Sequence, residues 1–185
     1  MMRGFTLIEV LVLIVVSVVA LLALVNLFLI FNSIYGYQQA FIATAGSAGK
    51  AMNALEASVL PADAVLASRT VGGTLYTSAT TTLVLELPSV DGSGNLVTGA
   101  KDYIVFYTAS TTLYRLVSAN AQSARISGTT ILSTTLSALS FTYDNTDFTK
   151  VTKVTTDIQT QKQFKTQILS SHLRGQWYLR NIPSL

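Results

Sequence analysis

Glu9 is the residue of this sequence whose type and position most clearly indicate a chemical role. It is the only charged residue between Arg3 and Lys50, and it lies within the apolar run FTLIEVLVLIVVSVVALLALVNLFLIF at residues 5–31. A carboxylate in a membrane helix costs about 2.5–3.5 kcal/mol at the bilayer centre and less near an end. We therefore expect this carboxylate to have a partner or a task.

Other residues capable of site chemistry are few. The 185-residue chain has one histidine, His172, and no cysteine, which excludes thiol nucleophiles, iron–sulfur clusters, disulfides and multi-histidine metal sites within one chain. His172 is interpreted as a polar strand residue, because spacing assigns it no nucleophile and no carboxylate. Residues 91–95 followed by Asp102 faintly resemble a calcium loop, but Leu96 stands where such a loop has glycine, so a hairpin turn is expected. No catalytic residue, cofactor or metal site is expected, and the chain is predicted not to be an enzyme.

The apolar run that contains Glu9 is long enough to cross a membrane. A spanning helix needs about 20 apolar residues, whereas the apolar core of a cleaved signal peptide has about 7–15. Arg3, ahead of the run, favours a cytoplasmic N-terminus and places the rest of the chain outside. The sequence thus predicts a single-pass protein of the cytoplasmic membrane, although a plain signal anchor leaves Glu9 unexplained.

The helical pattern continues beyond the apolar run, over residues 32–60. An apolar stripe repeats at steps of four and three residues, and Pro61 ends it. A helix from residue 5 to about residue 59 is about 80 Å long, which exceeds what one bilayer needs. We therefore expect its second half to pack on the chain's own head domain, through Phe41, Ala45, Ala48, Met52, Leu55 and Val59.

The head, residues 61–185, has the alternating pattern of a β-domain. Leu83, Leu85 and Leu87 are predicted to face one way, and Ile104 and Phe106 to face opposite to Val105. A final pair of strands is predicted at residues 151–158 and 164–177, with a turn at Gln161-Lys162. The expected fold class is α+β: one long helix on an antiparallel sheet. The net charge is +3 and the basic residues are scattered along the sequence, so no nucleic-acid binding is predicted.

The residues Arg3-Gly4-Phe5-Thr6-Leu7-Ile8-Glu9-Val10 resemble the N-terminal signature of type IV pilins and type II secretion pseudopilins. The absence of cysteine and of a proline before Pro61 favours a minor subunit, and residues 178–181 are weakly similar to minor pilins of the J/W type. The resemblance implies a leader at residues 1–4, cleavage by prepilin peptidase between Gly4 and Phe5, and methylation of the amine of Phe5. Residues 5–31 would form the membrane and filament-core helix, and Glu9 would assist filament assembly.

By the same resemblance, the expected partners are other pilin or pseudopilin subunits, prepilin peptidase, an assembly platform protein and an assembly ATPase. The expected destination is a pilus or pseudopilus at the cell surface, belonging to a pilus, secretion or DNA-uptake system. Two alternatives remain from the residues alone. One is a monomeric, membrane-anchored β-domain that binds a ligand outside the cell, and the other is an anchored hydrolase, for which no catalytic set is visible.

Overall fold

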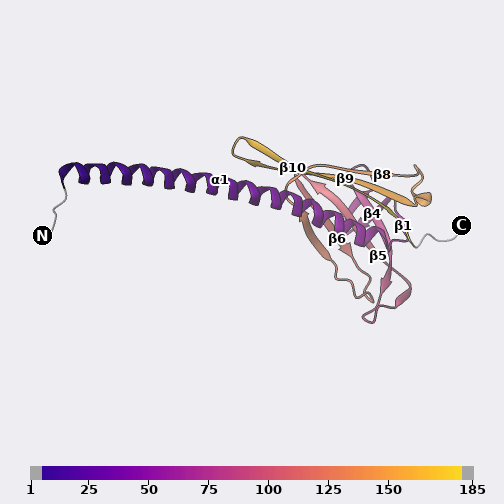
Figure 1. Ribbon diagram of the computed structural model, residues 1–185. Helices are drawn as coiled ribbons and strands as arrows, with labels where there is room; N and C mark the ends of the chain where they lie inside the picture. Colours follow the sequence, from indigo (N-terminus) through magenta and orange to yellow (C-terminus); the bar gives the residue numbers. More distant parts are fainter. Residues whose placement is uncertain (1–5, 181–185) are drawn as a thin grey trace. The chain divides into compact units, whose positions relative to one another are not determined.

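The computed structural model describes residues 6–180 of the chain (Figure 1). Its contacts divide the protein into two units, residues 1–40 and residues 41–185, and one helix, α1 (Leu7–Val59), contributes to both. Ten strands and one short 3-10 helix follow α1: β1 (Ala64–Val65), β2 (Ser68–Val71), β3 (Thr74–Thr77), β4 (Leu83–Val90), β5 (Leu96–Ala109), β6 (Thr112–Ser118), β7 (Gly128–Ser133), β8 (Leu136–Tyr143), η1 (Phe148–Lys150), β9 (Lys153–Phe164) and β10 (Gln167–Tyr178).

The strands of the second unit form three antiparallel sheets. The largest has the order β1-β4-β5-β6-β7, the second has the order β10-β9-β8, and β2 with β3 forms a separate hairpin. The larger two sheets and the end of α1 share one hydrophobic core. The predicted α+β class, a long helix packed on antiparallel sheet, is confirmed.

The two faces of the five-stranded sheet follow the predicted alternation. Leu83, Leu85 and Leu87 of β4 point into the core beneath α1, whereas Val84 points to the opposite face. In β5 the same holds for Ile104 and Phe106 against Val105. The outer face is covered by the β2–β3 hairpin, which contributes Val71 and Tyr76. The period of two in the sequence therefore identified the two faces of β4 and β5 correctly.

The helix face that enters the core differs in part from the predicted stripe. Ala48, Leu55 and Val59 are fully buried as predicted, and so is Ala51, which the stripe did not include. Because alanine side chains are small, they allow the sheets to approach the helix closely. The prediction that Phe41 packs on the head is wrong, since Phe41 is 49% exposed. The buried residue in this part of α1 is Thr44, which is 1% exposed. The hydroxyl of Thr160 on β9 donates to the carbonyl of Thr44 at 3.0 Å, so this part of α1 contacts β9 through a polar group.

The turn predicted at Gln161-Lys162 is also wrong. Strand β9 continues to Phe164, and Gln161 pairs with Ser170 in an unbroken ladder with β10. The chain reverses at residues 165–166, where Lys165 adopts a positive φ of 53°. Both faces of this part of the hairpin are mostly exposed, so no apolar alternation marks the strands. The polar pair Gln161-Lys162 inside such a strand therefore has the same composition as a turn.

Candidate functional site

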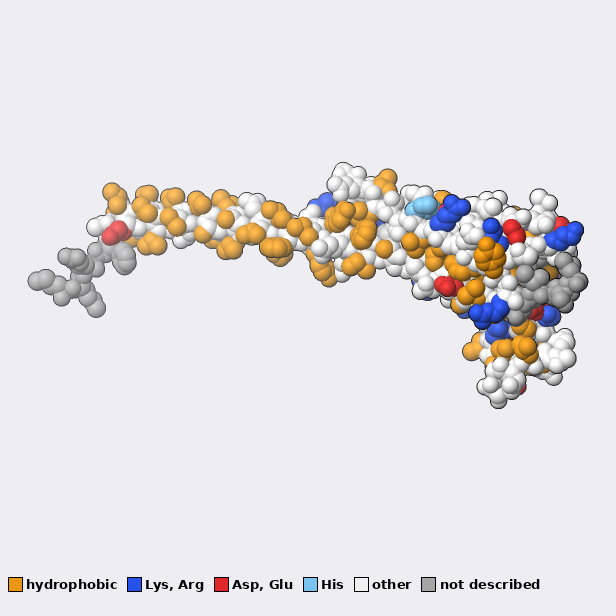
Figure 2. All heavy atoms as spheres, turned by 45° about the vertical axis from the view of Figure 1, so that its right-hand side comes forward, with side chains coloured by type: hydrophobic (Ala, Val, Ile, Leu, Met, Phe, Trp, Pro, Cys, Tyr) orange, Lys and Arg blue, Asp and Glu red, His pale blue; other side chains and the backbone are white. Residues whose placement is uncertain are grey.

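The membrane-type surface of the first unit is the most extensive functional feature of the described residues. Every residue from Thr6 to Asn32 is exposed, and nearly all of them are apolar. Figure 2 shows the hydrophobic side chains gathered along this part of α1. The helix is long and apolar enough to cross a membrane, and it is the one such helix among the described residues. Apolar surface of this extent requires cover by lipid or by other apolar helices.

The first turn of α1 contains a reciprocal hydrogen-bond motif between Thr6 and Glu9. A carboxylate oxygen of Glu9 accepts from the backbone N–H of Thr6 at 2.9 Å and from its hydroxyl at 3.0 Å, while the N–H of Glu9 donates to the Thr6 hydroxyl oxygen at 3.4 Å. Thr6 precedes the first helical residue, Leu7, and Glu9 is the third helical residue. This is the geometry of a capping box, which satisfies free N–H groups at a helix start.

The capping box gives Glu9 a local task that sequence reasoning missed. The signal was available, since threonine followed three residues later by glutamate ahead of an apolar run is a typical helix start. The motif also places the carboxylate at the positive end of the helix dipole. The assembly role stays a prediction. The predicted cleavage and methylation positions, Gly4 and Phe5, lie outside the described residues.

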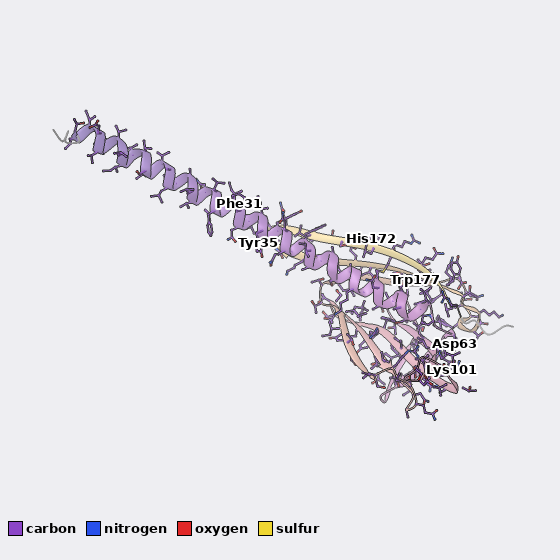
Figure 3. All side chains as sticks on the ribbon, turned by 60° about the horizontal axis from the view of Figure 1, so that its bottom comes forward. Phe31, Tyr35, Asp63, Lys101, His172 and Trp177 are labelled. Carbon is purple, nitrogen blue, oxygen red and sulfur yellow. The ribbon has the colours of Figure 1, made fainter. Side chains whose placement is uncertain are left out.

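Polar contacts fix the second half of α1 on the head. The hydroxyls of Ser47 and Ser133 are hydrogen-bonded at 2.6 Å, and Lys50 donates to the carbonyl of Ile131 at 3.0 Å. Trp177 of β10, labelled in Figure 3, packs against the core that α1 shares with the sheets. Met52 of α1 lies close to its ring. Trp177 is therefore partly in the core, whereas Tyr178 is 61% exposed.

Two other candidate residues of the sequence, His172 and Asp91, have contacts that indicate structural roles. The His172 side chain on β10 is 62% exposed, and its Nε2 lies 3.4 Å from a carboxylate oxygen of Asp157. Asp91 accepts from the N–H groups of Ser93 and Asn95 at 2.8 and 2.9 Å, which makes the predicted hairpin turn. These bonds lower the pKa of Asp91. His172 therefore lies on an exposed strand face, and Asp91 shapes a turn.

Asp102 is separated from Asp91 and belongs to a buried network. Its side chain is completely buried on β5, and its carboxylate accepts from the hydroxyls of Ser89 and Ser123, each at 2.7 Å, from the N–H of Asn120 at 2.7 Å and from Arg125 at 2.5 Å. Burial alone would raise the pKa of Asp102, but the four donors outweigh it and hold the pKa below the usual value. The network fastens the loop before β7 to the sheet, and sequence spacing gave no sign of it.

A second ion cluster joins the end of α1 to the sheet. Lys101 on β5 pairs with Asp63, which lies between α1 and β1, and its Nζ is 3.5 Å from a carboxylate oxygen of Glu86 on β4 (Figure 3). The hydrogen bond to Asp63 raises the pKa of Lys101. All three side chains have partners within the cluster, so it serves the fold.

Comparison of the chain with protein-family models, with curated proteins and with solved structures found no match. The functional assignment therefore depends on the N-terminal residues and on the architecture of the protein.

Proposed function

We propose that this chain is a minor subunit of a type IV pilus or of a related secretion or DNA-uptake filament. The observation that carries the proposal is the change of character within α1. Residues 6–32 are mostly apolar and are exposed on all sides, whereas residues 48–59 carry one buried face beneath a β-sheet head. The resemblance of residues 3–10 to prepilin signatures supports the same assignment. The role is structural rather than enzymatic.

In this proposal the precursor is held in the cytoplasmic membrane with its N-terminus inside and its head outside. Prepilin peptidase cuts between Gly4 and Phe5 and methylates Phe5. An assembly platform and its ATPase then transfer the apolar helix from lipid into a core of packed subunit helices. Both surroundings cover apolar surface, so the transfer need not expose the helix to water. Exposure to water would cost about 0.8 kcal/mol for each CH₂ group.

The decisive experiment compares the intact mass of the purified protein from cells with and without a prepilin peptidase. We expect loss of residues 1–4 and gain of one methyl group only when the peptidase is present. Replacement of Gly4 by a bulky residue serves as the uncleaved control. Sheared surface filaments should contain the mature chain. An intact N-terminus together with a monomeric membrane protein would contradict the proposal and favour the anchored ligand-binding β-domain.

The role of Glu9 is tested by two variants that differ in capping ability. Glutamine at the third helical position still completes a capping box, whereas valine does not. If the charge of Glu9 pairs with the amine of Phe5 in a neighbouring subunit, Glu9→Gln and Glu9→Val are both inserted and cleaved, yet both are depleted from filaments relative to the membrane pool. Normal incorporation of Glu9→Gln, with depletion of Glu9→Val and Thr6→Val, would reject charge pairing and leave capping as the task.

A further inference from the structure

The head contains a cavity of about 420 Å³ between the last turns of α1 and the inner face of the five-stranded sheet. Ala57 and Ser58 of α1 line one side. The walls from the sheet and the following loop are mainly apolar, and two arginines interrupt them. These lining residues include Leu87, Ile104, Val117, Ile126, Arg115 and Arg125. The volume falls in the range typical of small-molecule sites.

Arg115 is placed on the core side of β6 by the strand register. It pairs with Phe106 of β5, and its neighbours two residues away, Leu113 and Val117, both belong to the core beneath α1. A guanidinium therefore occupies a position where the pattern of the strand calls for an apolar side chain. Such a departure from the pattern is expected at functional positions.

The guanidinium of Arg115 lacks a counter-charge among the described residues. Its Nε is buried without a hydrogen-bond partner, and no carboxylate of residues 6–180 forms an ion pair with it. Arg125, the other cation of the cavity, is already paired with Asp102 and also donates to the carbonyl of Pro88 at 2.6 Å. A buried donor without a partner is costly, and such a group in a folded protein is explained by strain, by a functional role, or by a bound ion or water molecule.

We propose that this cavity binds a small organic monocarboxylate with a short hydrocarbon body. One unpaired cation matches one negative charge, and the planar guanidinium of Arg115 offers its N–H groups to the two oxygens of a carboxylate. The walls contributed by Leu87, Ile104, Val117 and Ile126 cover the hydrocarbon part. Arg125 remains bound to Asp102 and lines the cavity without a free charge. This binding is independent of the filament role, because every lining residue belongs to the second unit and none to the exposed apolar part of α1.

The test uses the full-length protein in micelles of a non-ionic detergent, with hexanoate as the probe. Calorimetric titration should show saturable binding of hexanoate, weaker binding of acetate and no binding of the neutral hexanamide. Arg115→Met should reduce the affinity for hexanoate by about tenfold or more, since a charge-assisted hydrogen bond is lost. Arg174→Met is the matched control, because Arg174 is 70% exposed on β10 and lies outside the cavity.

Two further readouts keep the result interpretable. Without ligand, Arg115→Met should unfold at the same temperature as the wild type or higher, because it removes an unpaired buried donor. In the wild-type protein, hexanoate should shift the NMR signal of the Arg115 Nε–H and leave that of Arg174 in place, which tests the site even where the variant is unstable. Equal binding by Arg115→Met, absence of any arginine signal shift at millimolar hexanoate, or preference for inorganic phosphate would overturn the proposal.

Discussion

Replacement of Asp102 by asparagine is expected to destabilise the head strongly while changing almost nothing in volume. The wild-type carboxylate accepts four hydrogen bonds, and its side chain is completely buried. An asparagine amide keeps one acceptor oxygen and turns an NH₂ group toward former donors. The hydroxyls of Ser89 or Ser123 can rotate to accept, but the guanidinium of Arg125 cannot accept a hydrogen bond.

The size of the destabilisation follows from the charge of Arg125, which Asp102→Asn leaves unpaired. Breaking a buried ion pair by removing one partner costs about 3–5 kcal/mol. The lower end applies here because the Arg125 side chain is 24% exposed and regains some water. A loss of about 3 kcal/mol corresponds to a fall of roughly 6–12 °C in the unfolding temperature of a domain of this size.

The assay is thermal unfolding of the full-length chain in detergent, followed by the β-sheet signal in circular dichroism. Asp147→Asn is the matched control. Asp147 is 47% exposed and caps η1 by accepting from the N–H of Thr149 at 3.0 Å. Asparagine caps a helix about as well as aspartate, so this control should change stability by less than about 0.5 kcal/mol.

The effect of Asp102→Asn should also depend on pH in a defined direction. Because the folded protein lowers the pKa of Asp102, its carboxylate contributes stability above the unfolded pKa of about 3.9, and this contribution is lost as the pH falls through the lowered folded pKa. The difference between wild type and Asp102→Asn should therefore be constant from about pH 5 to pH 8 and shrink below about pH 4. A cost no larger than that of Asp147→Asn, or one that stays unchanged in acid, would refute the reasoning.

Two further changes test the packing of the head. A Cβ at position 175 would lie 2.5 Å from the ring of Trp177 and 2.6 Å from the methyl group of Met52, so Gly175→Ala should cost about 1–3 kcal/mol and shift the fluorescence of Trp177, the only tryptophan, to longer wavelength. Gly92→Ala, where a Cβ meets nothing within 4 Å, should leave both properties unchanged, and equal behaviour of the two variants would contradict the packing. Tyr143→Phe removes the hydroxyl that bonds the carbonyls of Ala79 and Thr82 at 3.1 and 3.0 Å, so chemical denaturation should show a loss of about 1 kcal/mol, and no loss would show that these bonds are matched by water.

Much of the fold could be predicted from the sequence because its strongest signals are periodic. The alternation of Leu83, Leu85 and Leu87 and the end of the helix before Pro61 depend on local chemistry that tertiary structure did not override. The short strands β1, β2 and β3 were not predicted. They have two to four residues each, which is too few for a period of two to be recognised.

The features of the candidate sites that were missed are those made by residues far apart in the sequence. Asp102 meets Arg125 only because β5 and the loop before β7 are brought together by β6. Arg115 stands out only after the register assigns it to the core side of the sheet. The Thr6–Glu9 capping box is the exception, because its spacing of three residues was present in the sequence and a membrane-based explanation of Glu9 took precedence.

The two parts of α1, residues 6–32 and residues 48–59, have different roles. This difference explains how a subunit of the proposed kind can change its surroundings. The main core is built from residues between Ala48 and Leu179, and none of its members comes from residues 6–32. Moving the exposed apolar part of α1 from lipid into a bundle of helices therefore breaks none of the contacts of that core. The buried face at residues 48–59 uses alanines and single large side chains, Leu55 and Val59, so its stability depends on close packing with the sheets. The exposed part has no such dependence, since a helix that is apolar on all sides is covered equally well by acyl chains or by neighbouring helices. One continuous helix can thus hold the head folded through one segment while another segment exchanges one apolar environment for another.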